Sequence, residues 1–423
     1  MKEALLQYAW QHKLFYNNNL TTVNGNTLEI IDPGQLNTDA GPDFFNAKIK
    51  IGNTLWVGNV EVHVNSSDWE NHHHTENKAY STIILHVVAN WNANIYRTNG
   101  EEIEQFVLPY YQDLEQRYDA LLQQDAFVAC ADRLACVPRI LLSGWKNALL
   151  TERLERKTND IETLLANSQN DWEEAFYITL ARNFGTGINS IPFELLAKSL
   201  PQVYLAKHKD NLFQLEAMLF GQSGLLNDTS KDDYSQALKE EYDFLKRKYQ
   251  LQPINHHLWK LLRLRPHNFP HIRIAQFASL TYNSTKLFSK VINAKSLAEM
   301  ESLFQCNTSD YWQLHYTFNK LSASKNKPIG KSTVKVLLIN TVIPFLFSYG
   351  KYKDDERMQE KALTLLEQIP SEQNSIIANW KQHNIAASSA FDSQALIHLK
   401  KNYCDTKKCL QCRIGHFVLS QNR

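Results

Sequence analysis

Residues 41–63 read GPDFFNAKIKIGNTLWVGNVEVH, and this stretch decides the fold of the N-terminal part of the chain. Two runs of alternating apolar residues, 44–51 and 54–64, flank the pair Gly52-Asn53. A Gly-Asn pair between two strand-like runs is typical of the tight turn of a β-hairpin. The stretch therefore predicts two adjacent antiparallel strands.

Three polar residues whose side chains could bind a metal ion or transfer a proton lie on this predicted hairpin, namely Asp43, Glu61 and His63. Residues two apart in a strand share a face, so Glu61 and His63 point the same way. A regular hairpin would leave Asp43 on the opposite face. A bulge at Gly58 would shift the register by one residue, so that Asp43 faces His63 and lies diagonal to Glu61. We expect this bulged arrangement.

The segments around the hairpin predict a small α/β unit over residues 1–110. Residues 1–12 have the spacing of an amphipathic helix, and the apolar run 82–89 has the composition of a central strand. Over residues 111–400 the apolar positions recur with helical period, which predicts a large all-helical domain. Residues 401–423 form a short cysteine-containing tail. The expected fold class is therefore α+β.

The polar residues of the hairpin have the chemistry of a cation site. Two carboxylates that converge from neighbouring strands form an oxygen-rich site suited to Mg²⁺ or Mn²⁺. We therefore expect Asp43 and Glu61 to bind such an ion, and His63 to position or deprotonate a water molecule. The alternative is chance alternation on the polar face of an ordinary hairpin.

Three consecutive histidines, His72, His73 and His74, follow the hairpin. Imidazoles beside carboxylates can bind a transition metal, but neighbouring residues of a helix diverge by about 100°. We expect at most one or two of these histidines near Glu61, and an exposed polar loop is the alternative. His86 lies between apolar neighbours, so a buried and hydrogen-bonded side chain is expected there.

The bulk composition is ordinary for a water-soluble protein, with 43% hydrophobic and 21% charged residues among 423. No window approaches about 18 uninterrupted apolar residues, so we expect no membrane span. The first residues lack the apolar core of a signal peptide, and six cysteines in so long a chain make no secreted disulfide framework. The expected location is the cytoplasm.

The net charge of +1 conceals an uneven distribution of charged residues. Residues 244–353 contain 17 lysines and arginines and three acids, a net charge of +14, so the rest of the chain carries −13. A strongly basic region beside an acidic remainder predicts an anionic partner. Nucleic acid is the commonest such partner.

The basic region begins with a segment, 246–277, that contains no acid and alternates cations with Tyr249, Trp259, Phe269 and Phe277. Cations neutralise phosphates and aromatic rings stack on bases, so this segment is the expected nucleic-acid-binding surface. In the alternative interpretation the aromatic residues are core and the cations merely solvated. The expected phosphate contacts are Lys246, Arg247, Lys248, Lys260, Arg263, Arg265 and Arg273.

The tail carries three closely spaced cysteines, Cys404, Cys409 and Cys412. Thiols at this spacing in a reducing compartment indicate a metal more than a disulfide, so zinc or an iron–sulfur cluster is expected there. Small buried thiols in a packed tail are the alternative. The fourth ligand is left open among His416, His398, Cys130, Cys136 and Cys306.

Part of this pattern resembles the PD-(D/E)XK nucleases. Their motif places an aspartate at the head of one strand and Glu-x-Lys on the next, and His63 stands here in the lysine position. The resemblance is limited to residues 1–110 and implies a restriction-endonuclease-like domain, with Glu3 as an additional helical carboxylate. Some such nucleases hold an iron–sulfur cluster through C-terminal cysteines plus one upstream, a layout that the tail resembles loosely.

A second resemblance covers most of the chain. Five motifs occur in the order found in a bacterial family, domain of unknown function 2851: NTDAGPDFFNAKI, GNVEVHVNSSDW, LHVV, RPHNFP-x-IRIAQFA and YC-x4-CLQC-x-IG. This resemblance implies a bacterial cytoplasmic protein and carries no activity with it.

The residues themselves favour metal-dependent hydrolysis of nucleic-acid phosphodiesters. The first alternative is a non-catalytic nucleic-acid-binding or ribonucleoprotein-associated factor that keeps the fold without the chemistry. A purely structural interaction protein is the second alternative. Metal binding at Asp43 and Glu61 separates catalysis from both alternatives, and salt-dependent binding of nucleic acid separates the two alternatives from each other.

Overall fold

The computed structural model describes residues 2–16, 18–226, 232–284 and 286–420, and the chain divides into two compact units. The first unit comprises Met1–Trp145, Gln382–Asn384 and Leu399–Arg423, and the second comprises Lys146–Lys381 and Ile385–His398. The first unit thus extends past residue 110 and takes in the C-terminal cysteines.

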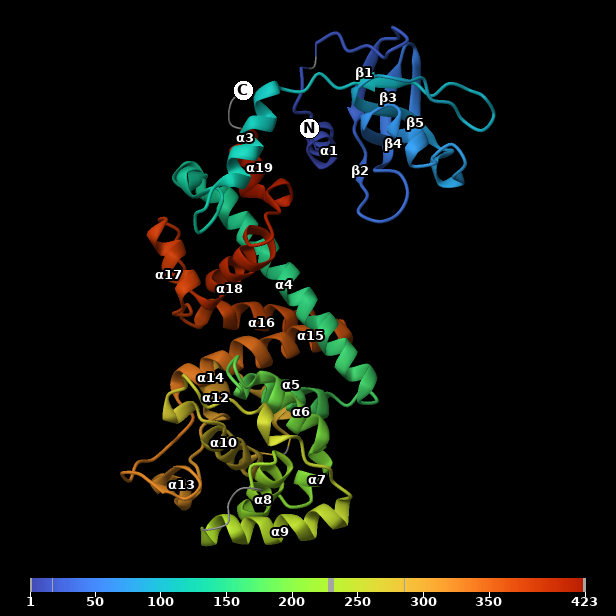
Figure 1. Cartoon of the computed structure of the whole chain (residues 1–423). Coiled ribbons are helices and arrows are strands. Elements are labelled where there is room, and N and C mark those ends of the chain that lie inside the picture. The colour runs from blue at the N-terminus through green and yellow to red at the C-terminus, as the bar shows by residue number, and fades with distance from the viewer. Residues whose placement is uncertain (1, 17, 227–231, 285, 421–423) are drawn as a thin grey trace. The chain divides into compact units, whose positions relative to one another are not determined.

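The first unit is built on a mixed β-sheet with helix α1 beside it (Figure 1). The order of helix, strand, hairpin, short helix and strand agrees with the sequence, and the α+β fold class is confirmed. The elements are α1 Glu3–Gln11, β1 Leu28–Asp32, β2 Gln35–Leu36, β3 Phe44–Ile51, β4 Thr54–Asn65, α2 Asp68–Asn71, β5 Ile83–Asn90, β6 Gln105–Val107, α3 Gln112–Gln123 and α19 Arg413–Ser420.

The strands of the main sheet follow the order β1-β3-β4-β5-β6, and β2 pairs with β3. The β1–β3 and β3–β4 pairs are antiparallel, whereas the β4–β5 and β5–β6 pairs are parallel. A parallel pair needs a crossover connection, and the segment containing α2 provides it between β4 and β5.

The two faces of β4 have opposite character because its side chains alternate. Val60 and Val62 are fully buried in an apolar cluster that also contains Leu6 and Trp10 of α1. The intervening Glu61 points to the other face of the sheet. A smaller apolar cluster of Trp69, Tyr80, Ile83, Ile95 and Ile103 is also buried in this unit.

The hairpin has the expected turn, but its bulge lies on β3 and not at Gly58. Phe44 pairs with Val60 and Ala47 with Gly58, so β3 contains one more residue than β4 between these two pairs. Asn46 accommodates the bulge with a positive φ of 57°, a conformation that asparagine tolerates well. Continued beyond Phe44, this register places Asp43 opposite Glu61 rather than opposite His63.

The second unit consists mainly of helices, as the sequence predicts, and also contains a small antiparallel ribbon of β7 and β8. Helix α4 begins in the first unit and continues into the second. The elements are α4 Arg139–Asn167, α5 Trp172–Phe184, α6 Ser190–Ser199, α7 Gln202–Ala206, α8 Leu212–Gln222, α9 Asp233–Tyr249, α10 Pro270–Asn283, α11 Leu287–Asn293, α12 Leu297–Ser302, α13 Asp310–Leu314, β7 His315–Thr317, β8 Lys320–Leu321, α14 Lys331–Leu337, α15 Ile343–Lys353, α16 Glu356–Gln368, α17 Ser375–Gln382 and α18 Ala390–Leu399.

One helical run of the described chain, Lys331–Lys353, is long and apolar enough to cross a membrane by length and composition. The structure buries 72% of its most apolar window. A core helix of a water-soluble protein meets the same criterion, so this run is weak evidence for a span. The absence of a membrane span stays a prediction.

Gly58 is required for the close approach of β4 and β5. A Cβ atom there would lie 2.4 Å from Ile84 Cγ2 and 2.8 Å from the Thr82 carbonyl oxygen. We predict that Gly58→Ala lowers the free energy of unfolding by about 1–3 kcal/mol, as overpacking does. Urea unfolding followed by tryptophan fluorescence measures this change.

The matched control is Gly144→Ala in α4, whose new Cβ would make an ordinary contact of 3.8 Å with Arg413 Nη1. This control should leave stability unchanged or raise it, because alanine favours a helix. Equal unfolding midpoints for Gly58→Ala and the wild-type protein would contradict the packing described at β4 and β5.

Candidate metal centre

Asp43 and Glu61 are joined at the head of the hairpin by two hydrogen bonds. The backbone N–H of Asp43 donates to Glu61 Oε2 at 3.0 Å, and the backbone N–H of Val62 donates to Asp43 Oδ2 at 3.0 Å. Gln7 of α1 also hydrogen-bonds to the Asp43 side chain. The structure therefore brings the two carboxylates together, although by a different register from the expected one.

His63 lies at the centre of a group of imidazoles next to these carboxylates. Its Nδ1 is 2.9 Å from His86 Nε2, and its Nε2 is 3.1 Å from His72 Nδ1. Glu61 Oε1 lies 3.5 Å from His63 Nε2 and 3.3 Å from His74 Nε2. Glu61 thus contacts two imidazoles on the polar face of the sheet.

Ligand atoms of His63, His72 and His74 all lie within 4.8 Å of one another, which is close enough to hold one metal ion. Two nitrogens bound to one tetrahedral ion at about 2.0–2.1 Å are separated by roughly 3.3 Å. The 3.1 Å between His63 Nε2 and His72 Nδ1 is near that value. The geometry fits a single ion with nitrogen ligands.

The turn after α2 explains why two of three consecutive histidines share a site. Helix α2 ends at Asn71, and His73 has a positive φ of 56°, so the helical divergence expected for these residues does not apply. His72 and His74 reach the same group of side chains, while His73 is exposed and outside it. The expectation of one or two histidines near Glu61 agrees with this placement.

His74 is an orphaned buried side chain. It is only 8% exposed, and neither of its ring nitrogens makes a hydrogen bond. A buried polar atom without a partner costs about 1–3 kcal/mol, so such atoms call for a partner. A metal ion shared with Glu61 would supply one.

A chain of hydrogen bonds orients His63. Gln105 Nε2 donates to the Ala93 carbonyl oxygen, which leaves Gln105 Oε1 facing His86 Nδ1 at 3.4 Å. His86 Nδ1 then carries the proton, and His86 Nε2 accepts from His63 Nδ1–H. The lone pair of His63 Nε2 is therefore directed toward His72 and Glu61. His86 is fully buried and hydrogen-bonded, as the sequence predicts.

Two of the imidazoles, His63 and His86, are held in their neutral form. Burial, with smaller contributions from the neighbouring His86, His74 and His72, lowers the pKa of His63 to about 2. Burial likewise lowers the pKa of His86 to about 4. Neutral imidazole is the form that binds metals, and an outer hydrogen-bond partner such as His86 is typical of a ligating histidine.

Burial has the opposite effect on two nearby carboxyl groups, those of Asp43 and Glu3, and raises their pKa. Burial and, to a smaller extent, the neighbouring Glu61 raise the pKa of Asp43 to about 7, against the hydrogen bonds from Val62 and Gln7. Burial also raises the pKa of Glu3, which lies near enough to His72 to be affected by it. Buried carboxylates at close range repel one another unless a cation or a proton lies between them.

A cavity of about 290 Å³ lies beside these residues, with His74 and Tyr80 in its lining. The two rings stack with centroids 3.8 Å apart. Arg97 also lines the cavity, and its guanidinium donates hydrogen bonds to the backbone carbonyl oxygens of Ser81 and Ile83. The cavity therefore offers space next to His74.

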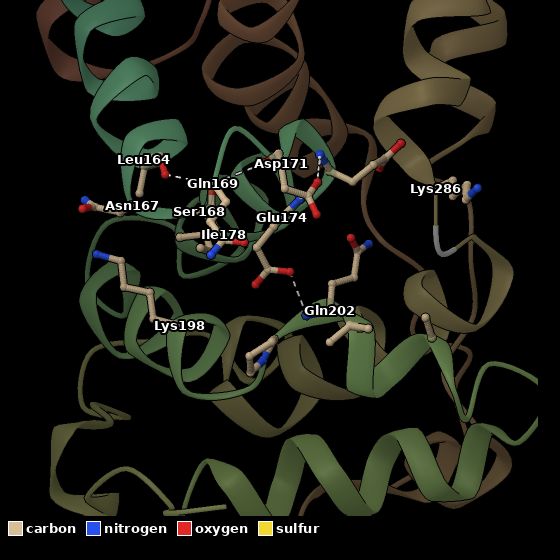
Figure 2. A pocket seen from close by; sticks show the side chains of 14 residues that line it. Leu164, Asn167, Ser168, Gln169, Asp171, Glu174, Ile178, Lys198, Gln202 and Lys286 are labelled. Atoms are coloured by element: carbon tan, nitrogen blue, oxygen red, sulfur yellow. Dashed lines mark hydrogen bonds between the residues drawn. The ribbon is translucent and has the colours of Figure 1, made fainter. Parts of the chain in front are cut away.

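A larger cavity, about 800 Å³, lies in the second unit and has no comparable chemistry (Figure 2). Asp171 in its lining accepts the backbone N–H groups of Glu173 and Glu174 at the start of α5. Glu174 accepts the backbone N–H of Gln202 at 2.9 Å. These carboxylates are occupied by helix ends, so the candidate site remains in the first unit.

The basic segment is only partly a surface. Arg273 is 5% exposed, and its guanidinium donates to Gln276, Asn268 and Thr333. A side chain held in this way cannot contact phosphate, so its assignment as a nucleic-acid contact is corrected. The other predicted contacts are exposed or half-buried, namely Lys246, Arg247, Lys248, Lys260, Arg263 and Arg265.

The aromatic residues of the basic segment belong largely to the core. Trp259 is 6% exposed and donates its indole N–H to the Ser223 carbonyl oxygen, and Phe277 is 1% exposed. Tyr249 stacks on Tyr204 with ring centroids 4.6 Å apart. The alternative interpretation from the sequence therefore holds for these rings, and base stacking on them is not supported.

The tail cysteines are free thiols in the first unit. Two residues considered as a fourth ligand are engaged elsewhere, because His416 Nδ1 lies 2.8 Å from the Tyr8 hydroxyl and His398 lies 3.2 Å from Glu152. Cys306 lies in the second unit and Cys136 is exposed. Cys130 is the remaining residue of that group.

A family model described as "Protein of unknown function (DUF2851)" matches residues 3–375. The chain belongs to this family. The matched range of the DUF2851 family contains both carboxylates and all four histidines of the candidate site, and it ends before Cys404. No curated protein and no solved structure matches the chain.

Two residues of the site, Gln7 and Gln105, did not stand out in the sequence. Gln7 follows Glu3 by four residues on the predicted first helix, a spacing that places both on one helix face. That spacing was the available signal for Gln7. Gln105 acts through His86 from a different strand, and its position depends on the sheet order.

The histidine group makes a prediction about metal binding. We expect the wild-type protein to bind one Mn²⁺ per chain at this site in isothermal titration calorimetry. Mn²⁺ is chosen because thiolates are poor ligands for it, so the tail cysteines should not compete. His74→Ala should weaken binding at least about 10-fold, since it removes a ligand nitrogen.

His73→Ala is the matched control, because it changes the exposed neighbour of two site residues. This variant should bind Mn²⁺ as the wild type does. Equal affinities for the wild type and His74→Ala would show that His74 is not a ligand.

Proposed function

We propose that the first unit is a metal-dependent phosphodiesterase that acts on nucleic acid. The observation that carries this proposal is that Glu61 accepts the backbone N–H of Asp43 and Asp43 accepts that of Val62, which holds both carboxylates beside three imidazoles that can share one ion. A metal ion held there would polarise a phosphoryl oxygen and lower the pKa of a bound water.

Each residue has a distinct part in this proposal. Glu61, His63, His72 and His74 would hold the ion, and Asp43 would lie beside it with its position fixed by the Val62 N–H. His86 and Gln105 would keep His63 Nε2 directed at the ion through their hydrogen bonds. Glu3 adds a carboxylate from α1, the place where the nuclease resemblance puts an additional acid.

The replacement of lysine by His63 affects the choice of metal. A lysine would supply a positive charge, whereas the neutral His63 imidazole supplies a lone pair. Nitrogen ligands suit transition metals better than Mg²⁺, which prefers oxygen. We therefore propose Mn²⁺ or a similar transition metal, and not Mg²⁺, as the activating ion.

The alternative function is nucleic-acid binding without cleavage. The loop between α9 and α10 favours it, because Lys260, Arg263 and Arg265 are exposed there and the 246–277 segment lacks acids. Arg263 has a positive φ of 64°, and the backbone of Lys260 is fixed by two hydrogen bonds to the Asn189 side chain. This fixed cationic loop suits a phosphate backbone.

The proposed activity predicts cleavage of single- or double-stranded DNA or RNA in the presence of Mn²⁺. Asp43→Asn and Glu61→Gln should each lower the cleavage rate by at least about 100-fold, because each removes a carboxylate from the site. Asp39→Asn, the same chemical change at an exposed position of the preceding loop, should leave the rate unchanged.

Cleavage that persists in Asp43→Asn would refute the assignment of the site. A wild-type protein that binds Mn²⁺ at the histidines and cleaves none of the four substrates would favour the binding function instead.

The cationic loop predicts salt-dependent affinity for nucleic acid. Each lost phosphate contact reduces the slope of log K against log[salt] by about 0.9 for duplex DNA. We expect the triple variant Lys260→Glu, Arg263→Glu, Arg265→Glu to lose most of its affinity in fluorescence anisotropy titrations, with a shallower slope.

The control is Lys286→Glu, Lys290→Glu, Lys295→Glu, which makes the same change of net charge at other exposed positions of the second unit. A loss of affinity in this control equal to that of the loop variant would indicate a general charge effect and contradict a defined loop surface.

A further inference from the structure

Four cysteines of the first unit form a second group of ligand-type side chains. Cys130 precedes the turn Ala131–Cys136, Cys404 ends the turn Lys400–Cys404, Cys409 begins the turn Cys409–Gln411, and Cys412 precedes α19. None of them forms a disulfide. Thiols from two distant parts of the chain thus meet in one unit.

Backbone hydrogen bonds fold the tail into tight turns at its cysteines. The Lys407 N–H donates to the Cys404 carbonyl oxygen at 3.1 Å, and the Cys412 N–H donates to that of Cys409 at 3.3 Å. Gly415 permits the close turn, because a Cβ there would lie 2.1 Å from the Cys409 carbonyl oxygen.

Cys130 is joined to this tail by packing. Cys130 and Cys409 pack against the same apolar cluster, which includes Leu419 of α19. Lys407 Nζ donates to the Leu122 carbonyl oxygen at 2.6 Å and so ties the tail to the segment before Cys130. Cys130 and the tail cysteines therefore lie in one packed region of the first unit.

The four thiols are close enough to influence one another. Burial, with smaller contributions from Cys412 and Cys409, raises the pKa of Cys130 to about 12. Burial raises the pKa of Cys404 as well, with contributions from Cys412, Cys130 and Cys409.

The surroundings supply donors for thiolates. The backbone N–H groups of Ile414 and Gly415 hydrogen-bond to the Cys412 thiol at the start of α19. The indole N–H of Trp145, which is 7% exposed, is also directed at this thiol. Residues 400–413 contain five lysines and arginines and one acid.

The spacing of the thiols distinguishes between kinds of metal site. A tetrahedral zinc ion with bonds of about 2.3 Å holds its sulfurs roughly 3.8 Å apart. Over the described ranges the histidines form the one group of three or more ligand-type side chains that all lie within 4.8 Å of one another, so no three of these thiols are as close together as a single ion requires. A cubane cluster, whose four irons each take one thiolate, fits a wider arrangement.

We infer that Cys130, Cys404, Cys409 and Cys412 hold a [4Fe–4S] cluster. The cluster would join the C-terminal segment to the turn that follows α3. It requires four thiolates, and the Trp145, Ile414 and Gly415 N–H groups would donate to its sulfurs. This inference is independent of the phosphodiesterase proposal, because none of the four cysteines belongs to that site.

The test is the metal content of the full-length protein purified without oxygen. We expect about four irons and four acid-labile sulfides per chain, with the broad visible absorbance of an iron–sulfur protein that bleaches on reduction. Cys130→Ala and Cys412→Ala should lose most of the iron and sulfide. Cys136→Ala, which changes an exposed cysteine six residues from Cys130, should retain both.

Far-UV circular dichroism of each variant separates loss of the cluster from loss of the fold. Wild-type protein that contains zinc without sulfide would overturn the inference in favour of a single-ion site. Wild-type protein without metal, whether its thiols are free or form disulfides, would also overturn it. Equal iron loss in Cys136→Ala and Cys130→Ala would refute the choice of ligands.

Discussion

The two hydrogen bonds between Asp43 and strand β4 are the constraint on which the first unit depends. Each carboxylate of the pair accepts a backbone N–H from the other strand, from Asp43 to Glu61 and from Val62 to Asp43. This register places Val60 in the core and Glu61 on the polar face. A slip of one residue would bury Glu61 against α1. The site therefore forms only in this register of the hairpin.

The same constraint places negative charge where water is scarce. Glu61 is 4% exposed, and within the described residues its ion-pair partners are His63 and His74, with no lysine or arginine. Burial keeps the His63 imidazole neutral, so this side chain cannot offset the charge of a carboxylate. A divalent cation held there would offset the charge of Glu61 and would also coordinate His74, whose ring nitrogens make no hydrogen bond within the part of the chain that the structure describes.

The hairpin, its turn and the helical region could be predicted because they depend on local patterns of apolar residues and on Gly52-Asn53. The position of the bulge could not be predicted from these patterns, because either strand can accommodate the extra residue. The cross-strand hydrogen bonds of Asp43 determine which strand contains it. The meeting of His72 with His74 depended on where α2 ends. The burial of Arg273 could not be predicted, because a count of charged residues does not show which side chains are buried. The sequence likewise does not show which residues lie near the tail, so Cys130 was one of several candidates for the fourth ligand.

The central claim is that one metal ion lies between Glu61 and the histidines. Its most direct test is a crystal structure of the protein with Mn²⁺, with diffraction data collected on both sides of the manganese absorption edge. The account predicts an anomalous peak at about 2.0–2.2 Å from ligand atoms of Glu61, His63, His72 and His74. Ordered side chains at these four positions with no anomalous peak between them would contradict it.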